Sequence, residues 1–250
     1  MQISESDLPW VNVPSVIRKG RNLSDGYRRG MAIQFSQELC ERIASDPLYK
    51  EARHLIEGRS LLVEANRMNL FLLIKLYLRK LPFGHIVEFG AYKGGNALFM
   101  ALLAKQCLPG VQVYAFDTFA GMPSSDAAVD MHGPGDFSDV DLGELIEYAR
   151  SLGVDNLHPV KGLFEDTAPE VLPGIGRLAL CHIDCDILSA VLYSYRVTKP
   201  YMVPGAYWVF DDALVSSCLG ATEAVEEIIQ RDRIFSEQTY PHWVFRSGLG

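Results

Sequence analysis

The chain has 250 residues, of which 48% are hydrophobic and 22% are charged, and its formal net charge is −8. This size and composition predict one globular domain with room for a small appendage. No block of Lys and Arg indicates a track for a phosphate backbone, so we expect no nucleic-acid partner. The apolar stretch near 70–78 is too short to span a bilayer, so we expect no membrane partner.

The cysteines and the start of the chain indicate the compartment. The five cysteines are scattered, and none forms a Cys-x-x-Cys pair, so the spacing predicts no zinc site. The first residues contain no basic-then-apolar signal segment. An odd number of dispersed cysteines without such a segment favours a reducing environment, and we expect a cytoplasmic protein.

Residues 1–60 differ from the rest of the chain because they begin polar and locally basic. Apolar residues at helical spacing, Phe35, Leu39 and Ile43, predict a helix over 34–44. We interpret 1–60 as a helical appendage that packs on the domain or forms an oligomer contact, and we expect a homo-oligomer. A second amphipathic helix is predicted over 68–80, and the following segment, which contains Pro82 and Gly84, is expected to end it.

From residue 86 onward, predicted strands and helices alternate. The strands are expected at 86–90, 111–116, 157–161, 178–183 and 206–210. The helices are expected at 96–106, 144–152, within 187–204 and at 221–232, and a closing antiparallel hairpin is expected at 234–239 and 242–245. This alternation predicts an α/β domain over 61–250 with a doubly wound, mostly parallel sheet.

One long loop, 118–140, interrupts the alternation. It is rich in Gly, Pro and Asp and follows the end of a predicted strand. A loop of this length inside a compact domain is usually functional or disordered. Because it leaves the carboxyl end of a strand, where open α/β sheets bind ligands, we expect it to act as a lid.

Two acidic clusters follow buried strands: Asp184 and Asp186 flank Cys185, and Asp211 precedes Asp212. The carboxyl ends of neighbouring parallel strands meet at one edge of a sheet, so three or four carboxylates should gather there. Burying them unpaired is costly, whereas a hard cation such as Mg²⁺ prefers oxygen ligands. A single Asp at a strand end usually caps a turn or helix, but this grouping favours a metal site.

A glycine-rich turn from Glu88 to Gly95 lies between a predicted strand and a predicted helix. Its spacing is not the Gly-x-Gly-x-x-Gly of dinucleotide sites, and an acidic residue comes first. That acid suits a cationic partner, such as an amino group or a sulfonium. Asp117, at the end of the next strand, could accept hydrogen bonds from ribose hydroxyls.

These segments resemble the macrocin O-methyltransferase family, enzymes that use S-adenosylmethionine and Mg²⁺ to methylate sugar hydroxyls on natural products. The resemblance covers about 60–230 and rests on the turn 88–95, on 115–123, on 162–167 and on the two acidic clusters. Cys185 departs from the family, which usually has Gly at this position. Residues 1–60 carry no usable resemblance to the family.

The resemblance implies a Rossmann-like class I methyltransferase fold and a set of site residues. Mg²⁺ would be held by Asp184, Asp211 and Asp212. The residues that would line S-adenosyl-L-methionine are Leu61, Glu88, Gly90, Tyr92, Gly94, Asp117, Phe119, Gly162 and Phe164. Two candidates for the general base stay open, His132 in the lid and Asp186. We interpret His182 as a buried strand histidine with satisfied hydrogen bonds.

We therefore expect a metal-dependent O-methyltransferase that acts on a sugar hydroxyl of a glycosylated small molecule. A methyltransferase acting on a catechol is one alternative, and a nucleotide-binding dehydrogenase is another, which the absent Gly-x-Gly-x-x-Gly opposes. A non-catalytic oligomeric partner that retains the fold is a third alternative. The intact acidic clusters oppose it.

Overall fold

The structure is a computed structural model that describes residues 17–18, 21–22, 36–234 and 236–248. The chain divides into two compact units, Met1–Gln34 and Phe35–Gly250. In the first unit, β1 (Ile17–Arg18) pairs antiparallel with β2 (Arg21–Asn22). The first two residues of the helix predicted at 34–44, including Phe35, lie outside the described residues.

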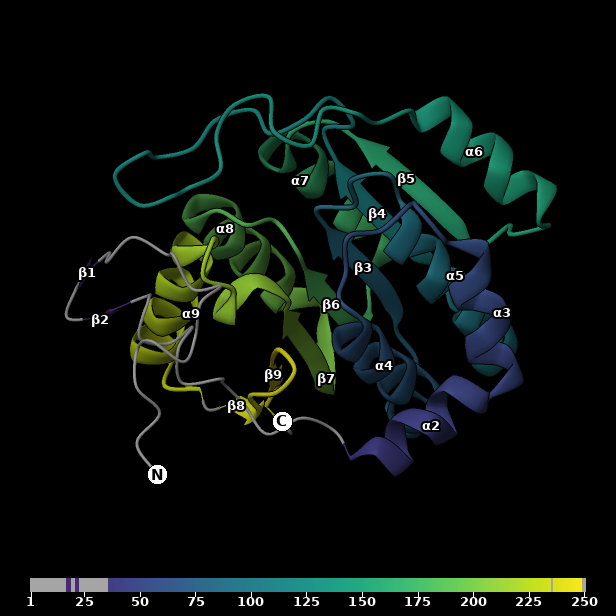
Figure 1. Ribbon diagram of the computed structural model, residues 1–250. Helices are drawn as coiled ribbons and strands as arrows, with labels where there is room; N and C mark the ends of the chain where they lie inside the picture. The colour runs from purple at the N-terminus through teal and green to yellow at the C-terminus, as the bar shows by residue number, and fades with distance from the viewer. Residues whose placement is uncertain (1–16, 19–20, 23–35, 235, 249–250) are drawn as a thin grey trace, which may run out of the picture. The chain divides into compact units, whose positions relative to one another are not determined.

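The second unit contains a mostly parallel sheet, as predicted (Figure 1). Its described strands run in the order β5-β4-β3-β6-β7-β9-β8. Their bounds are β3 (His85–Phe89), β4 (Val113–Asp117), β5 (Leu157–Lys161), β6 (Leu178–Ile183), β7 (Met202–Phe210), β8 (Ser236–Gln238) and β9 (Trp243–Arg246). Strands β3 to β7 pair parallel, and β9 pairs antiparallel with β7 and β8, which confirms the predicted hairpin.

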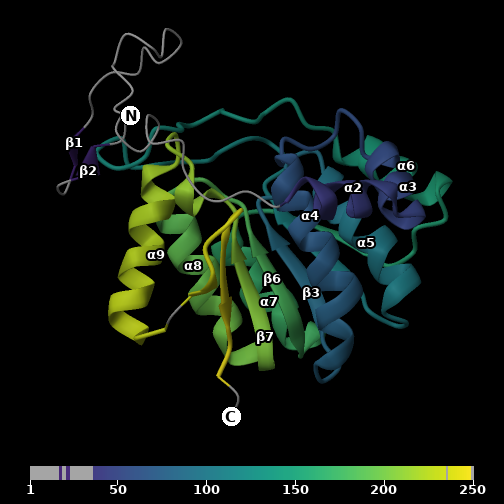
Figure 2. The same cartoon turned by 60° about the horizontal axis from the view of Figure 1, so that its bottom comes forward.

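Helices cover both faces of this sheet because its strands are buried on both sides. Figure 2 shows α8 (Leu188–Thr198) and α9 (Leu219–Asp232) on one side, and α4 (Glu64–Leu72) and α5 (Gly95–Cys107) on the other. Neighbouring residues of one strand enter opposite cores, as the pleat requires. Leu180 of β6 belongs to the core beneath α4 and α5, and Cys181 belongs to the core beneath α8 and α9.

Helices α2 (Gln37–Ser45) and α3 (Pro47–Leu55), which fall in the segment predicted as an appendage, belong to the same compact unit as the sheet. Ile43, Tyr49 and Ala52 are buried in the core that also contains α4 and α5. Asp46 links the two helices, because its side chain accepts hydrogen bonds from the first backbone N–H groups of α3. Residues 37–55 therefore help to build the core.

The predicted helices differ from the observed ones in three places. The helix expected at 68–80 is α4 followed by a π-turn over 73–77 and a 3₁₀ turn over 78–80. Helix α3 and helix α7 (Phe164–Ile175) were not predicted. Helix α7 contains Pro169 and Pro173, and proline inside a pattern opposes helix, whereas Pro47 is the first residue of α3, where proline is favoured. The described part of the chain also contains α6 (Leu142–Ser151) and short 3₁₀ helices at Lys199–Tyr201 and Asp212–Leu214.

The sheet order places a switch point between β3 and β6, because the chain builds β4 and β5 on one side of β3 and β6 and β7 on the other. Open α/β sheets bind ligands outside the carboxyl ends of strands at such a point. No described helix is long and apolar enough to cross a membrane.

Candidate active site

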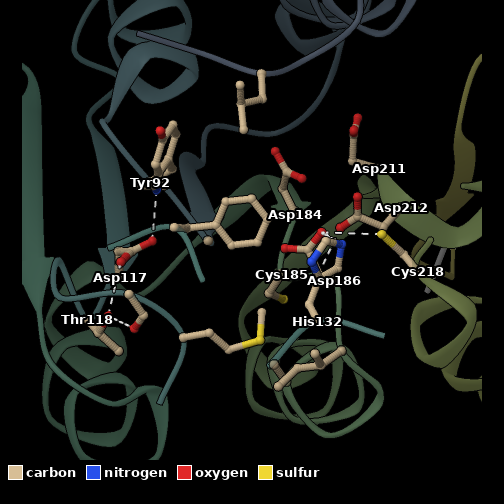
Figure 3. A pocket seen from close by; sticks show the side chains of 18 of the residues that line it. Tyr92, Asp117, Thr118, His132, Asp184, Cys185, Asp186, Asp211, Asp212 and Cys218 are labelled. Atoms are coloured by element: carbon tan, nitrogen blue, oxygen red, sulfur yellow. Dashed lines mark hydrogen bonds and ion pairs between the residues drawn. The ribbon is translucent and has the colours of Figure 1, made fainter. Parts of the chain in front are cut away.

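A cavity of about 670 Å³ opens at the carboxyl ends of β3, β6 and β7 (Figure 3). One side is lined by the turn after β3 and by Asp117, and the other side by the acidic residues that follow β6 and β7. The two halves that the sequence predicted separately, a glycine-rich turn and clustered carboxylates, therefore share one cavity.

The predicted metal ligands Asp184, Asp211 and Asp212 come together in the structure. Each offers one carboxylate oxygen, and these oxygens lie within 4.8 Å of one another. Burial, together with the charges of the neighbouring aspartates, raises the pKa of Asp184 and of Asp212 well above the usual range. A donor set made only of oxygens, with excess negative charge, fits a hard divalent cation.

Asp211 is held by donors from outside the acidic clusters. Its Oδ1 accepts hydrogen bonds from Asn66 Nδ2, at 2.8 Å, and from His242 Nδ1, at 2.9 Å. Burial alone raises the pKa of Asp211, but the facing rings of His182 and His242 outweigh burial and lower it below the usual range. Asp211 is therefore fixed in orientation, and both bonds go to the same oxygen.

His182 lies between two carboxylates on the strands that flank β6. Its Nδ1 is 3.0 Å from Glu88 Oε1 on β3, and its Nε2 is 3.5 Å from Asp211 Oδ1 beyond β7. The distance from Nε2 to Asp211 is long for a hydrogen bond, so Nε2 has no hydrogen-bond partner. The charge of Asp211 still attracts the ring. Burial opposes protonation, but Asp211 and Glu88 outweigh it and raise the pKa of His182 to about 9. The expectation of a fully satisfied histidine holds for Nδ1 alone.

Glu88 lies behind the cavity wall and is fully buried. Its Oε1 accepts a hydrogen bond from Asn96 Nδ2, at 2.5 Å, and also faces His182. Among the described residues, Glu88 Oε2 and Asn96 Oδ1 are buried acceptors without a donor. Asn96 itself lines the cavity. Buried polar groups are normally hydrogen-bonded, so Asn96 Oδ1, which belongs to a residue of the cavity lining, fits a ligand that brings an N–H donor.

The glycine-rich turn is packed tightly against the end of β6. Gly90 has φ +89°, and a Cβ built there would lie 1.7 Å from the carbonyl oxygen of Asp184. Asp117 holds the turn from β4, because its carboxylate accepts hydrogen bonds from Tyr92 N, at 2.8 Å, and from Phe119 N, at 2.7 Å. Burial is the main cause that raises the pKa of Asp117.

The structure sorts the predicted cofactor residues into two groups. Leu61, Gly90, Tyr92, Asp117 and Phe164 line the cavity. The other four, Glu88, Gly94, Phe119 and Gly162, are not part of its lining. Gly94 and Gly162 have positive φ, +74° and +145°, and serve turns at the ends of strands, and Phe119 is buried.

The two candidates for the general base are neighbours in the cavity. His132 Nε2 lies 3.8 Å from Asp186 Oδ1, and His132 Nδ1 lies 3.4 Å from Asp136 Oδ2. Asp186 has φ +60°, and its N–H donates to Asp212 Oδ2 at 2.9 Å. Burial raises the pKa of Asp186 above the usual range for a carboxylic acid. The hydrogen bond to Asp212 connects His132 and Asp186 to the acidic trio, which consists of Asp184, Asp211 and Asp212.

The loop over 118–140 is anchored on both sides of the cavity. Asp139 accepts a hydrogen bond from Tyr92 Oη, at 2.7 Å, and pairs with Lys93 Nζ, at 2.6 Å. The buried Asp130 accepts a hydrogen bond from the N–H of Leu188, the first residue of α8, at 2.9 Å. The loop therefore joins the cofactor turn to the helix that follows the first acidic cluster.

Sequence analysis missed four polar residues at the site: Asn66, Asn96, Cys218 and His242. Asn66 and Cys218 line the cavity, and His242 contacts Asp211 from the C-terminal hairpin. Asn96 lies in α5 directly after the glycine-rich turn, and this position was the available signal for it. The other three lie in segments that carry no motif of their own.

Comparison with known proteins identifies the family. A family model described as macrocin O-methyltransferase matches residues 67–237. A tetracenomycin-C derivative 4′-O-methyltransferase from Streptomyces olivaceus is 30% identical over 150 residues, 55% of this chain, and the match spans 56% of that protein's length. Mycinamicin III 3″-O-methyltransferase from Micromonospora griseorubida is 24% identical over 82% of this chain and 92% of its own length.

Solved structures show the same fold. A calicheamicin methyltransferase superposes with a TM-score of 0.66 at 20% identity and covers 94% of this chain and all (100%) of its own. The O-methyltransferase NovP superposes with a TM-score of 0.63 at 19% identity, over 84% of this chain and 95% of its own. The family model covers more than half of the chain, and the dehydrogenase alternative is thereby excluded. The chain belongs to the macrocin O-methyltransferase family and is an O-methyltransferase.

Proposed function

We propose that this protein transfers the methyl group of S-adenosylmethionine to a sugar hydroxyl of a glycosylated small molecule, with Mg²⁺ or a similar divalent ion as a cofactor. The observation that carries the proposal is the shared cavity, in which Asp117 and the turn at Gly90 lie opposite three clustered carboxylates. The named relatives support the sugar acceptor, since both are O-methyltransferases of glycosylated compounds.

The cofactor is assigned to the side of the cavity next to β3 and β4. Asp117 would accept hydrogen bonds from the ribose hydroxyls, because a carboxylate has room for acceptors beyond its two backbone bonds. Phe164 would lie by the adenine and Leu61 by the methionine end. The unpaired oxygen of Asn96, a residue of the cavity lining, supports an N–H donor of the cofactor nearby, such as its amino group.

The metal is assigned to Asp184, Asp211 and Asp212. When bound there, a divalent cation lowers the proton affinity of a sugar hydroxyl, which is otherwise a poor nucleophile at neutral pH. Asn66 and His242 hold Asp211 through one oxygen, so the orientation of this carboxylate is set before any ion arrives. All three donor groups are carboxylates, which favours Mg²⁺ over softer ions.

The remaining steps belong to side chains at the centre of the cavity. His132, at Nε2, or Asp186, at a carboxylate oxygen, takes the proton of the acceptor hydroxyl. The acceptor oxygen then attacks the methyl carbon as the sulfur leaves, and much of the acceleration comes from holding these atoms in line. The loop over 118–140 excludes water through its contacts on both sides of the site.

The direct test is mass spectrometry of rhamnosylated natural products incubated with the protein and S-adenosylmethionine. We expect a gain of one methyl group on the sugar, loss of this activity with EDTA, and its return with Mg²⁺. Calorimetry should show binding of S-adenosylhomocysteine and none of NAD.

The variant Asp211→Asn separates the metal from the cofactor. It keeps the shape of the side chain but removes one charge from the trio, so it should raise the Mg²⁺ concentration needed for half activity. S-adenosylhomocysteine should still bind, because its assigned contacts lie along Gly90 and Asp117. Full methyl transfer by metal-stripped protein would remove the metal from the proposal and leave a metal-free methyltransferase.

A further inference from the structure

A second group of ligating side chains lies beside the acidic trio in the same cavity (Figure 3). It consists of His132, Asp186 and Cys218, and one ligand atom of each lies within 4.8 Å of the others. Cys218 Sγ is 3.3 Å from Asp186 Oδ1, and His132 Nε2 is 3.8 Å from the same oxygen. The three residues come from the lid loop, the turn after β6 and the start of α9, so no local spacing could reveal the group.

The distances fit a tetrahedral metal site. Ligand atoms bound at about 2.0–2.3 Å to a tetrahedral zinc ion lie roughly 3.3–3.7 Å from one another. The Sγ–Oδ1 distance of 3.3 Å lies within about 0.2 Å of the value for a sulfur and an oxygen ligand, and the Nε2–Oδ1 distance of 3.8 Å exceeds the value for a nitrogen and an oxygen ligand by about 0.4 Å, so a bound ion would draw the ring of His132 slightly closer. The donors are a nitrogen, an oxygen and a sulfur, a set that suits borderline-soft ions, whereas the acidic trio offers oxygens alone.

The surroundings orient two of the three ligands. Asp136 Oδ2 lies 3.4 Å from His132 Nδ1, so it can hold the ring with Nε2 turned toward Asp186. A carboxylate on the outer nitrogen of a histidine is the usual arrangement behind a metal-binding imidazole. Asp186 is held by the bond from its N–H to Asp212, at 2.9 Å.

We propose that His132, Asp186 and Cys218 form a second metal site, selective for zinc-like ions and distinct from the site assigned to Mg²⁺. A water molecule or an acceptor oxygen would complete the four ligands from the cavity. Binding exchanges the thiol proton of Cys218 for the ion, and the proton passes to solvent.

Occupation of this site should inhibit methyl transfer. This consequence rests on the proposed function, in which His132 or Asp186 accepts the proton of the acceptor hydroxyl. An ion bound to both side chains removes both acceptors at once. Zinc would then act as an inhibitor while Mg²⁺ remains on the acidic trio.

Cobalt spectroscopy tests the site without reference to activity. We expect wild-type protein with Co²⁺, in the presence of excess Mg²⁺, to show a thiolate-to-cobalt charge-transfer band that Zn²⁺ abolishes. Cys218→Ser should lose the band. Cys185→Ser is the matched control, because Cys185 is equally buried beside Asp186 but faces Ser194 Oγ, at 3.9 Å, and it should keep the band.

The outcomes are distinct. No band in the wild type, or an unchanged band in Cys218→Ser, overturns the site. If Cys218→Ser does not fold, His132→Ala in the loop provides the second variant, and it should weaken Co²⁺ binding at least tenfold. Unchanged affinity in that variant also overturns the site.

The inhibitory role is tested with the methyltransferase assay at saturating Mg²⁺. Cys218→Ser should raise the Zn²⁺ concentration for half inhibition at least tenfold relative to Cys185→Ser. Equal inhibition of both variants would place the inhibitory zinc on the acidic trio and overturn the role. Absence of methyl transfer without zinc would instead refute the proposed function, and the cobalt spectrum would still decide the site.

Discussion

Among the described carboxylates that line the cavity, Asp211 has partners that outweigh its burial, whereas burial still raises the pKa of Asp117. Asp211 receives two hydrogen bonds, and Asp117 receives two from backbone N–H groups. Burial and the charges of the neighbouring aspartates raise the pKa of Asp184 and of Asp212. Two hydrogen bonds each hold Asp211 and Asp117 in position, and the charges of the neighbouring aspartates make Asp184 and Asp212 the side chains that most need a cation.

Asp117 provides a test of the cofactor assignment. We expect Asp117→Ala to weaken S-adenosylhomocysteine binding by about 1–3 kcal/mol, because hydrogen bonds from the ribose hydroxyls to a charged group are lost. Calorimetry with and without Mg²⁺ checks this, and the affinity for Mg²⁺ should change little. Unchanged cofactor affinity in a folded variant would remove Asp117 from the site.

The general base is identified by two variants that leave the cofactor side untouched. Replacing the true base should lower turnover roughly 10²–10⁴-fold while S-adenosylhomocysteine binding is retained. His132→Ala and Asp186→Asn are compared at saturating acceptor and Mg²⁺. Should neither variant slow methyl transfer, the proton goes elsewhere and metal activation of the hydroxyl suffices.

At the scale of elements, the close approach of the turn after β3 to the end of β6 can be measured by substitution. Gly90→Ala combines a positive φ with a Cβ 1.7 Å from a backbone oxygen, so it should cost more than about 3 kcal/mol of folding stability. Gly110→Ala is the control: its φ is +84°, but the nearest atom to its Cβ would be 3.8 Å away. It should cost about 1–2 kcal/mol. Equal losses in urea unfolding would contradict the tight packing.

Helices α8 and α9 are joined at one end by Asp232. Its Oδ2 accepts hydrogen bonds from Tyr195 Oη and Lys199 Nζ, each at 2.8 Å. Burial alone raises its pKa, but the bonds from Lys199 and Tyr195 outweigh burial and lower the pKa to about 2, from 3.8. Because the folded pKa is lowered, this stabilisation is present above pH 3.8 and is lost as the pH falls through 2.

Asp232→Asn should therefore reduce the free energy of unfolding by about 1–2 kcal/mol at pH 7, a modest value because Lys199 is half exposed and water screens the pair. The difference from wild type should be unchanged at pH 5 and fall to about half by pH 3. Urea unfolding at these pH values measures it. A difference that stays constant down to pH 3 would show that the contribution of Asp232 is not electrostatic.

The elements that could be predicted from the sequence are those with a clear hydrophobic period. The parallel strands β6 and β7 are largely apolar runs, and the expected bounds of the parallel strands differ from the observed ones by a residue or two at most points. Helix α7 was missed because Pro169 and Pro173 lie inside it, and there packing outweighs the local preference of proline against helix. Helix α3 is short, and its available start signal was Asp46 followed by Pro47.

The same limit applies to the site. Asp117, Asp184 and Asp211 could be placed together because each follows a strand of one parallel sheet. Asn66 and His242 reach Asp211 from a helix start and a C-terminal hairpin, and Cys218 reaches Asp186 from the start of α9. Their positions depend on tertiary packing, which spacing along the chain does not encode.

For the whole molecule, a divalent ion should act as a stabilising ligand. Mg²⁺ at 100 times its dissociation constant should add about 2.7 kcal/mol to the free energy of unfolding, and it should therefore raise the Tm by roughly 5–10 °C. In EDTA, Asp212→Asn should melt above wild type because repulsion within the trio falls, and its gain from Mg²⁺ should be smaller. Asp155→Asn, a surface aspartate paired with Lys105, is the control. A wild-type Tm that ignores Mg²⁺ would contradict a metal at the trio.

The anchoring of the lid loop over 118–140 determines where substitutions could change the range of acceptor substrates during evolution. Asp130 binds the first N–H of α8, and a Cβ at Gly220 would lie 1.9 Å from its Oδ1, so this part of the loop is fixed by two helices. Met122, Pro123 and Ser124 line the cavity without such anchors. Sequence variation among relatives should therefore concentrate at 122–124, where an altered side chain changes acceptor recognition while α8 and the residues before it keep their positions.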